Sequence, residues 1–274
     1  MEAAAVLFDG VLLASDYDGT LVSADGISDE VRRAIRFFIS NGGRFTVCTG
    51  RTLLGFHAYS PEIINAPVVL ANGGMTYDYA RGEIAAFRGI DDEGIAPLRA
   101  VMRILPQVCI EMYPLQKAYA INLSKQSEHH FRVQNISFET VADPADAPKP
   151  WAKVMLSGNS DDTQRAQQVL SNYPQVSFLP TNANFLEVLG KGVNKGAAIA
   201  DLASSLNITS DNVYAIGDSY NDVAMLRAAH VGFVPSNGNE QARAAGDVIV
   251  RSNEDGAVAN VIEILARMYG GSYA

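Results

Sequence analysis

The sequence predicts a doubly wound α/β domain that is built on a parallel sheet and interrupted by a smaller α+β unit. In the first and last thirds of the chain, short apolar runs rich in β-branched residues alternate with amphipathic stretches, which is typical of parallel βαβ units. In the middle third, pairs of strands with alternating polarity lie between helix-like segments, which favours an antiparallel sheet. Because the two outer segments match in class, we expect residues 1–86 and 185–274 to form one domain, with residues 87–184 inserted into it.

The elements of the outer domain begin with a strand at residues 11–15. Ser28 then offers an N-cap with two acidic residues behind it, apolar residues recur at helical spacing, and Asn41-Gly42-Gly43 ends the helix. The pattern continues with strands at 45–49, 68–71, 213–216 and 231–234, a hairpin at 76–86, and helices near 193–206, 219–229 and 256–269.

The inserted unit contains both kinds of element. Its helices are expected on one face of the antiparallel sheet, and the Pro- and Ala-rich run from Asp143 to Pro150 is expected to be a loop inside it. We predict helices at 91–104 and 161–172, and strands at 107–112, 117–123, 151–157 and 175–180.

Composition excludes several classes of protein. The content of 48% hydrophobic and 19% charged residues is that of a packed globular chain, and the net charge of −9 opposes binding to nucleic acid. No apolar run approaches the ~18 residues of a membrane span, and Met1-Glu2 begins no basic region of a secretory signal. Cys48 and Cys109 lie in strand-like segments and are expected to be buried thiols, which fits a reducing cytoplasm.

Two aspartates directly follow the first predicted strand, in the string Asp16-Tyr17-Asp18-Gly19-Thr20-Leu21. In an open parallel sheet, ligands bind beyond the carboxyl ends of the strands, so both carboxylates are expected there. A turn at Gly19 would keep Asp16 at the strand tip and let Asp18 approach the same substrate atom from another direction. Taken alone, the string is explained as well by an Asp-Gly turn with solvated acids.

Three further strings lie beside predicted strands or helices. Thr49-Gly50-Arg51 ends a strand with a hydroxyl that can donate to a phosphoryl oxygen and a glycine that permits close backbone approach. Lys195 lies near the start of a helix, where the helix dipole disfavours a cation, which points to another reason for its position. The string from Gly217 to Asp222 supplies the hard oxygen ligands that Mg²⁺ prefers. Each string also has a simple explanation when it is taken alone. The first could be a common turn, Lys195 could be a solvated lysine, and the string from Gly217 to Asp222 could be a capping turn.

Together DYDGTL, TGR, GVNKG and GDSYND, in this order, resemble the motifs of the haloacid dehalogenase-like phosphatase superfamily. The similarity is to its Cof-type members, which carry a large α/β cap of type C2B after the second motif, and Ala71-Asn72-Gly73-Gly74 matches as well. The resemblance covers nearly the whole chain, although the cap matches only by its length and order of elements. It implies a Rossmann-like core and a Mg²⁺-dependent phosphatase of small phosphorylated metabolites such as sugar phosphates.

The resemblance also implies roles for individual residues. Asp16 would be the nucleophile that forms an aspartyl-phosphate, and Asp18 would protonate the leaving oxygen and then deprotonate the hydrolytic water. Thr49 and Lys195 would hold the phosphoryl oxygens.

The remaining implied roles concern the metal and the substrate. Asn221 would orient Lys195 or an aspartate. The implied Mg²⁺ ligands are the Asp16 carboxylate, the Asp18 backbone carbonyl, Asp218, and Asp222 either directly or through water. The residues expected to contact substrate are Gly50, Arg51, Asn72, Gly73 and Asn221.

Two other functions are compatible with parts of these motifs. A sugar phosphomutase shares the DxDGT string, but no basic cluster in residues 87–184 is seen to hold two substrate orientations. A catalytically silent binding protein is disfavoured because both aspartates, the lysine and the GDSYND string are intact.

Several residues have simpler explanations. Asp9-Gly10 lacks the second aspartate and is interpreted as a hairpin turn. Arg51 either contacts substrate or pairs with an acid at the boundary between core and cap. No role is assigned to the four histidines, which have no metal-ligand spacing. Lys153 is interpreted as a structural or surface residue, and Glu187 as a structural partner.

Overall fold

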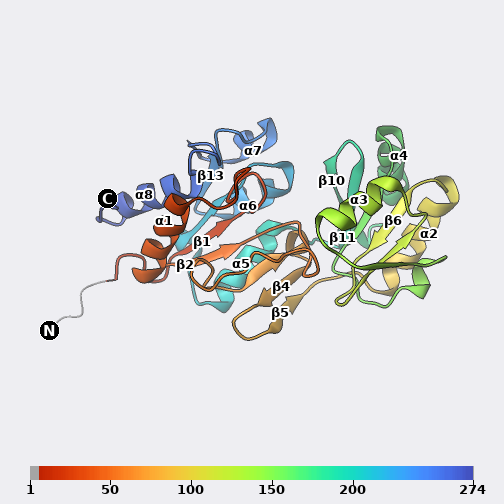
Figure 1. Cartoon of the computed structure of the whole chain (residues 1–274), viewed down its shortest axis with the longest axis horizontal. Coiled ribbons are helices and arrows are strands. Elements are labelled where there is room, and N and C mark those ends of the chain that lie inside the picture. The colour runs from red at the N-terminus through yellow and green to blue at the C-terminus, as the bar shows by residue number, and fades with distance from the viewer. Residues whose placement is uncertain (1–5, 274) are drawn as a thin grey trace.

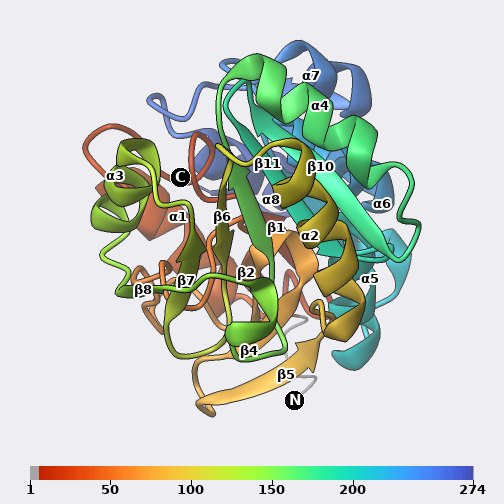
Figure 2. The same ribbon diagram turned by 90° about the vertical axis from the view of Figure 1, so that its right-hand side faces the viewer.

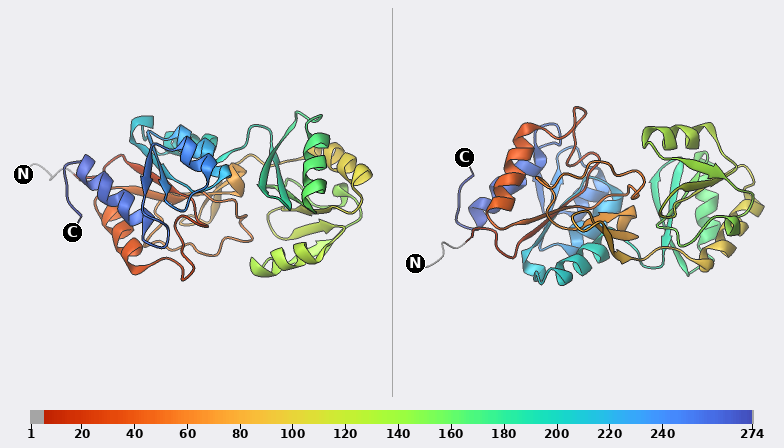
Figure 3. Two further views of the ribbon diagram at one scale, coloured as in Figure 1. Left: turned by 90° about the horizontal axis from the view of Figure 1, so that it is seen from above. Right: turned by 60° about the horizontal axis from the view of Figure 1, so that its bottom comes forward.

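The computed structural model describes residues 6–273 and has two lobes, a core and a cap (Figures 1 and 3). The first five residues lie outside this range, so the start of the predicted outer domain and the Met1-Glu2 observation are not described by it. The core sheet is all parallel, in the order β14-β13-β12-β1-β2. Its strands are β1 (Leu12–Ser15), β2 (Arg44–Val47), β12 (Val213–Ile216), β13 (Val231–Pro235) and β14 (Val248–Val250).

Helices cover both faces of the core sheet, which makes it doubly wound. Apolar residues of α1 (Asp29–Ser40) and α8 (Ala257–Met268) pack on one face, and those of α5 (Lys195–Ser205) and α6 (Val223–Ala228) pack on the other. The strands are therefore buried on both sides and consist almost entirely of apolar residues. The predicted cap at Ser28 is present, where its side chain accepts a hydrogen bond from the Val31 N–H. The remaining core helix is α7 (Glu240–Ala245).

A small antiparallel sheet of β3 (Val68–Leu70), β4 (Met75–Asp78) and β5 (Glu83–Phe87) lies next to β2. A single parallel bridge between Cys48 and Val69 joins the two sheets, and η1 (Ala71–Gly73) links β3 to β4. The predicted hairpin at 76–86 is therefore present. Asp9-Gly10 lies in a turn before β1, but described residues 6–8 form no strand, so the hairpin predicted there was wrong.

The cap contains a six-stranded sheet in the order β10-β11-β9-β6-β7-β8, antiparallel except for the pair β7–β8. Its strands are β6 (Cys109–Met112), β7 (Ala118–Ile121), β8 (Phe138–Thr140), β9 (Val154–Ser157), β10 (Val176–Asn182) and β11 (Phe185–Gly190). The last of these strands, expected in the outer domain, pairs with β9 and β10, so the cap sheet extends to residue 190.

Two cap helices, α2 (Ile95–Ile104) and α4 (Ser160–Leu170), pack on the sheet face that looks away from the core (Figure 2). The third helix, α3 (Lys125–Val133), packs on the opposite face through Phe131, beside Tyr113 and Met155. The two predicted cap helices therefore share one face as expected, and α3, which was not predicted from the sequence, lies on the other. The short 3₁₀ turns are η2 (Asp92–Gly94), η3 (Pro144–Asp146), η4 (Ser210–Asn212) and η5 (Tyr220–Asp222).

Among the described residues, no helix has both the length and the apolar character needed to cross a bilayer.

Candidate active site

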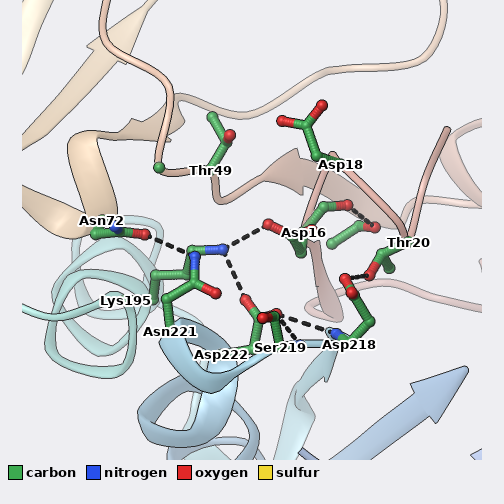
Figure 4. Close-up of polar contacts among 12 residues, drawn as sticks. Asp16, Asp18, Thr20, Thr49, Asn72, Lys195, Asp218, Ser219, Asn221 and Asp222 are labelled. Atoms are coloured by element: carbon green, nitrogen blue, oxygen red, sulfur yellow. Dashed lines mark hydrogen bonds and ion pairs between the residues drawn. The ribbon is translucent and has the colours of Figure 1, made fainter. Parts of the chain in front are cut away.

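Asp16 lies at the carboxyl end of β1, beside the end of β12. Parallel pairing sets Ser15 opposite Ile216, and the Asp16 N–H donates to the Ile216 carbonyl at 2.9 Å. The side chain is 5% exposed, and its Oδ1 accepts a hydrogen bond from Lys195 Nζ at 2.5 Å (Figure 4). This ion pair leaves Asp16 Oδ2 available at the edge of the sheet where the other motifs meet.

Asp18 points away from Asp16 in the structure (Figure 4). Its two carboxylate oxygens accept hydrogen bonds from Arg51 Nη2 at 2.6 Å and Nε at 2.8 Å, a bidentate pair that is partly exposed. Arg51 was expected either to contact substrate or to pair with an acid, and in the structure it pairs with Asp18. The guanidinium also lies 5.0 Å from the centre of the Tyr17 ring.

Lys195 is the first residue of α5 and is fully buried. Asn194 caps this helix by accepting from the Ala197 N–H, and the lysine side chain reaches Asp16 and, at 2.6 Å, Asp222 Oδ1. Burial lowers the pKa of Lys195, but the two carboxylates more than offset this and raise it above its ordinary value. The ammonium therefore stays charged, which explains a cation at an otherwise unfavourable helix start.

Asp222 uses both carboxylate oxygens within the protein. While Oδ1 accepts from Lys195, Oδ2 accepts from the backbone N–H groups of Asp218 at 3.0 Å and Ser219 at 2.9 Å. Asp218 Oδ1 accepts from the Thr20 hydroxyl at 2.6 Å. Asp222 thus shapes the loop and holds the lysine, which favours contact with a metal through water over direct ligation.

The cluster of Asp16, Asp218 and Asp222 brings three carboxylate oxygens within 4.8 Å of one another. Burial raises the pKa of Asp16, and the nearby lysine opposes this rise; burial also raises the pKa of Asp218. Three carboxylates share one ammonium, so the ionised cluster carries two more negative than positive charges. Hard oxygen donors with this excess charge fit a divalent cation such as Mg²⁺.

Thr49 is buried beyond the end of β2, where its hydroxyl accepts from the Arg51 N–H at 3.1 Å. It lines the same cleft as Asp16 and Asp18, together with Gly50 and Arg51. The TGR string is therefore at the same sheet edge as the aspartates, as expected from the positions of the strand ends.

Asn72 and Asn221 form a link behind this cluster. Asn221 Nδ2 donates to Asn72 Oδ1 at 3.0 Å, and Asn72 Nδ2 donates to Glu187 Oε2 at 2.6 Å. The described hydrogen bond of the Asn221 side chain therefore goes to Asn72, and not to Lys195 or an aspartate as expected. Gly73 packs on the Asn194 backbone and is not among the residues that line the cleft.

Lys153 joins the cap to the core. Its Nζ donates to the Gly50 carbonyl at 2.8 Å and to Glu187 Oε1 at 2.9 Å, and both side chains are about 5% exposed or less. The sequence suggested only structural roles for these two residues. The alternating polarity of the strands around them does not predict a contact between Lys153 and the loop at Gly50, about a hundred residues away in sequence.

The cleft between the lobes has a volume of about 380 Å³. The buried residues Lys195, Asp222 and Asn72 do not line it, so the contact with substrate expected for Asn72 is not seen. The lining residues of the core are Asp16, Asp18, Thr49, Gly50, Arg51, Asp218, Ser219 and Asn221, and the cap contributes His130, Val133, Gln134, Met155 and Thr181 in addition to Lys153 and Glu187. None of the first five cap residues was expected from the sequence, and His130 was set aside because it lacks metal-ligand spacing.

Comparison with known proteins gives the chain a family. A family model described as haloacid dehalogenase-like hydrolase matches residues 13–262. A Bacillus subtilis (strain 168) protein, 5-amino-6-(5-phospho-D-ribitylamino)uracil phosphatase YwtE, is 24% identical, covering 96% of this chain and 99% of its own. A second phosphatase of the same name from that strain, YcsE, is 27% identical, covering 92% of this chain and 94% of its own.

Solved structures agree in fold. A haloacid dehalogenase-like hydrolase from Bacteroides thetaiotaomicron superposes with a TM-score of 0.82 at 23% identity, covering 93% of this chain and 99% of that one. The subclass IIB sugar phosphatase BT4131 also has a TM-score of 0.82, at 19% identity, covering 95% of this chain and 99% of its own.

Proposed function

The chain belongs to the haloacid dehalogenase-like hydrolases and is a phosphatase of that family, and we propose that it hydrolyses phosphomonoesters of small metabolites through an aspartyl-phosphate on Asp16. The observation that carries this proposal is the Asp16 carboxylate itself, with one oxygen held by Lys195 and the other available in the cleft. The proposed substrates are sugar phosphates and similar esters.

In the first step, Asp16 Oδ2 bonds to phosphorus, and the bond between phosphorus and the alcohol oxygen breaks. Asp18 gives its proton to that oxygen, for which it has to leave Arg51 and rotate towards the reacting atoms. Thr49 and Lys195 bind oxygens of the phosphoryl group. In the second step Asp18 takes a proton from a water molecule whose oxygen attacks phosphorus; the bond between phosphorus and Asp16 Oδ2 breaks, and inorganic phosphate leaves.

Mg²⁺ is the proposed cofactor, held by Asp16, Asp218 and the Asp18 carbonyl, with Asp222 acting through water. When bound, it supplies positive charge that offsets the repulsion between the carboxylates and a phosphate dianion. The excess negative charge of the carboxylate cluster supports this assignment.

The inserted sheet is proposed to act as a cap, with core residues 6–86 and 191–273 and cap residues 87–190. A roof over the cleft excludes bulk water and large substrates, which supports small metabolites over phosphoproteins. The printed names of YwtE and YcsE specify a phosphate ester of a ribityl chain, so that compound belongs in a substrate screen beside sugar phosphates. The free, buried thiols Cys48 and Cys109 support the cytoplasmic location proposed for the enzyme.

The test is release of inorganic phosphate from p-nitrophenyl phosphate and from sugar phosphates with Mg²⁺. Asp16→Asn should abolish release, whereas Asp18→Asn should slow it about 100-fold or more and accumulate phosphorylated protein in acid-quenched samples. Asp9→Asn is the matched control, because Asp9 is exposed in the turn before β1. Turnover by Asp16→Asn would contradict the covalent mechanism, and phosphate exchange between sugar positions without net release would indicate a mutase.

A further inference from the structure

The cap sheet turns one face towards the catalytic loops. Glu187, Met155 and Glu111 are direct partners on three neighbouring strands, so their side chains project from the same face. Lys153 and Tyr113 lie two residues further along two of these strands and share that face. This face therefore forms the roof of the cleft, and most of its polar groups have no part in the proposed chemistry.

His130 extends from α3 over this face, and its ring is held by two buried groups. Its Nδ1 lies 2.8 Å from Glu111 Oε2, and the same oxygen accepts the Tyr113 hydroxyl at 2.5 Å. Tyr113 and Glu111 are each at most 1% exposed, whereas the His130 side chain is 19% exposed and lines the cleft. Burial and the Glu111 carboxylate raise the pKa of Tyr113, so its hydroxyl stays protonated and donates. The ring is therefore fixed before any ligand arrives.

Burial of the Glu111 carboxylate is unfavourable, because it removes the group from water. One of its oxygens makes both bonds, and Oε1 is buried with no hydrogen-bond partner among the described residues. A buried carboxylate that is only partly paired lowers stability. With Nδ1 turned to Glu111, the nitrogen that remains is His130 Nε2, which contacts the side-chain amide of Gln134, another residue of the cleft. Glu111 thus holds the His130 imidazole in a fixed orientation, in which it and the Gln134 amide face the cleft.

Before substrate binds, the arginine and lysine side chains that line the cleft are each matched by a carboxylate. Arg51 pairs with Asp18, and Lys153 pairs with Glu187. A second phosphate group on the substrate would need a cation that is not already paired, because desolvating a dianion is costly. Hydroxyl groups, in contrast, can be bound by neutral donors and acceptors such as an imidazole and an amide.

From this arrangement we propose that His130, oriented by Glu111 and Tyr113, forms with Gln134 the site that binds a hydroxyl group of the leaving alcohol. The cleft accordingly selects monophosphates of uncharged polyhydroxy compounds over their bisphosphates. This inference rests on the proposed function, since it concerns the leaving group of the same reaction.

The first experiment compares kcat/KM for glucose 6-phosphate with kcat/KM for p-nitrophenyl phosphate, whose leaving group has no further hydroxyl. In His130→Ala, the ratio of the two values should fall about tenfold, the effect of one hydrogen bond of ordinary net strength. His130→Gln should restore part of the ratio, because it keeps a polar group at this position. His129→Ala is the matched control: His129 is the exposed neighbour, contacts Arg132, and should leave the ratio unchanged.

A purely structural role for His130 would lower both kcat/KM values by the same factor, and an unchanged ratio would overturn the proposal. A second measurement uses only the wild-type enzyme and does not depend on how a variant folds. Glucose 6-phosphate should be hydrolysed with a kcat/KM at least tenfold above that of glucose 1,6-bisphosphate, and preference for the bisphosphate would contradict the inference. An enzyme that releases phosphate from none of these esters would instead refute the proposed function, and this inference with it.

Discussion

Lys195 shows how much one buried side chain organises at this site. It contacts carboxylates from two motifs that lie about two hundred residues apart, and it is itself fully buried. Its role is electrostatic as well as structural, because Asp16 and Asp222 would repel each other without it.

Replacing this lysine should therefore affect stability and catalysis together. In Lys195→Met, two buried carboxylates lose their shared cation, which should lower the free energy of unfolding by about 3 kcal/mol and reduce kcat at least 100-fold. Urea unfolding and phosphate release measure the two effects. Lys191→Met, a change at an exposed lysine in the same loop, should alter neither; equal stability of the two variants would show that the buried pair contributes little.

At the scale of residues, the sequence predicts the motif side chains and misses those of the cap. Asp16, Thr49, Lys195 and Asp218 could be predicted because each lies at a strand end or helix start of the parallel sheet, where topology alone brings them together. His130 and its partners depend on how α3 packs on a separate sheet, and no spacing along the chain encodes that contact.

At the scale of elements, boundaries could be predicted where local sequence signals set them. The predictions were wrong where contacts with other parts of the fold set the boundary. The segment 219–229 was expected to be one helix, but the hydrogen bonds of Asp222 to the loop make its start a 3₁₀ turn before α6. The strands β8 and β14 have three residues each and are too short to show a period. Residues 185–190 were expected in the outer domain, but they form β11 and pair with the cap strands β10 and β9 that precede them in the chain.

The loop η1 is fixed against α5 by a glycine. Gly73 has a φ of +103°, and a Cβ at this position would lie 2.5 Å from the Asn194 carbonyl oxygen. Gly73→Ala should therefore lower the free energy of unfolding by about 3 kcal/mol, from backbone strain and overpacking together. Differential scanning calorimetry or urea unfolding can test this.

The matched control is Gly82→Ala, at the tip of the β4–β5 hairpin. Gly82 also has a positive φ, of +69°, but open space surrounds it, so only the backbone cost of about 1 kcal/mol is expected. If the two variants lost equal stability, close packing of η1 on α5 would not matter.

For the whole molecule, the decisive property is the negative charge concentrated between the lobes. Burial raises the pKa of Asp16 and Asp218 in the folded state, so folding becomes less favourable as the pH rises above the carboxyl pKa of the unfolded chain, until the folded groups have ionised. A divalent cation that binds the ionised groups, as proposed for Mg²⁺, would reverse this loss.

Magnesium should accordingly raise Tm more at pH 7.5 than at pH 5. At a concentration of 100 times Kd, the stabilisation should be about 2.7 kcal/mol, and chelation should remove it. Asp218→Asn should lose most of this shift, while Asp211→Asn, an exposed change just before β12, should keep it. An equal shift in the Asp218 variant would place the ion elsewhere.

The hydrogen bond from Lys153 to the Gly50 carbonyl ties the roof of the cleft to the loop beside Thr49. A second bond between the lobes runs from Asn72 Nδ2 to Glu187 Oε2, so opening would have to break both, whereas Lys153 and Glu187 both lie in the cap and stay paired. In the proposed cycle, opening would thus be resisted by the loop beside Thr49, and the departure of product would have to wait until both bonds break.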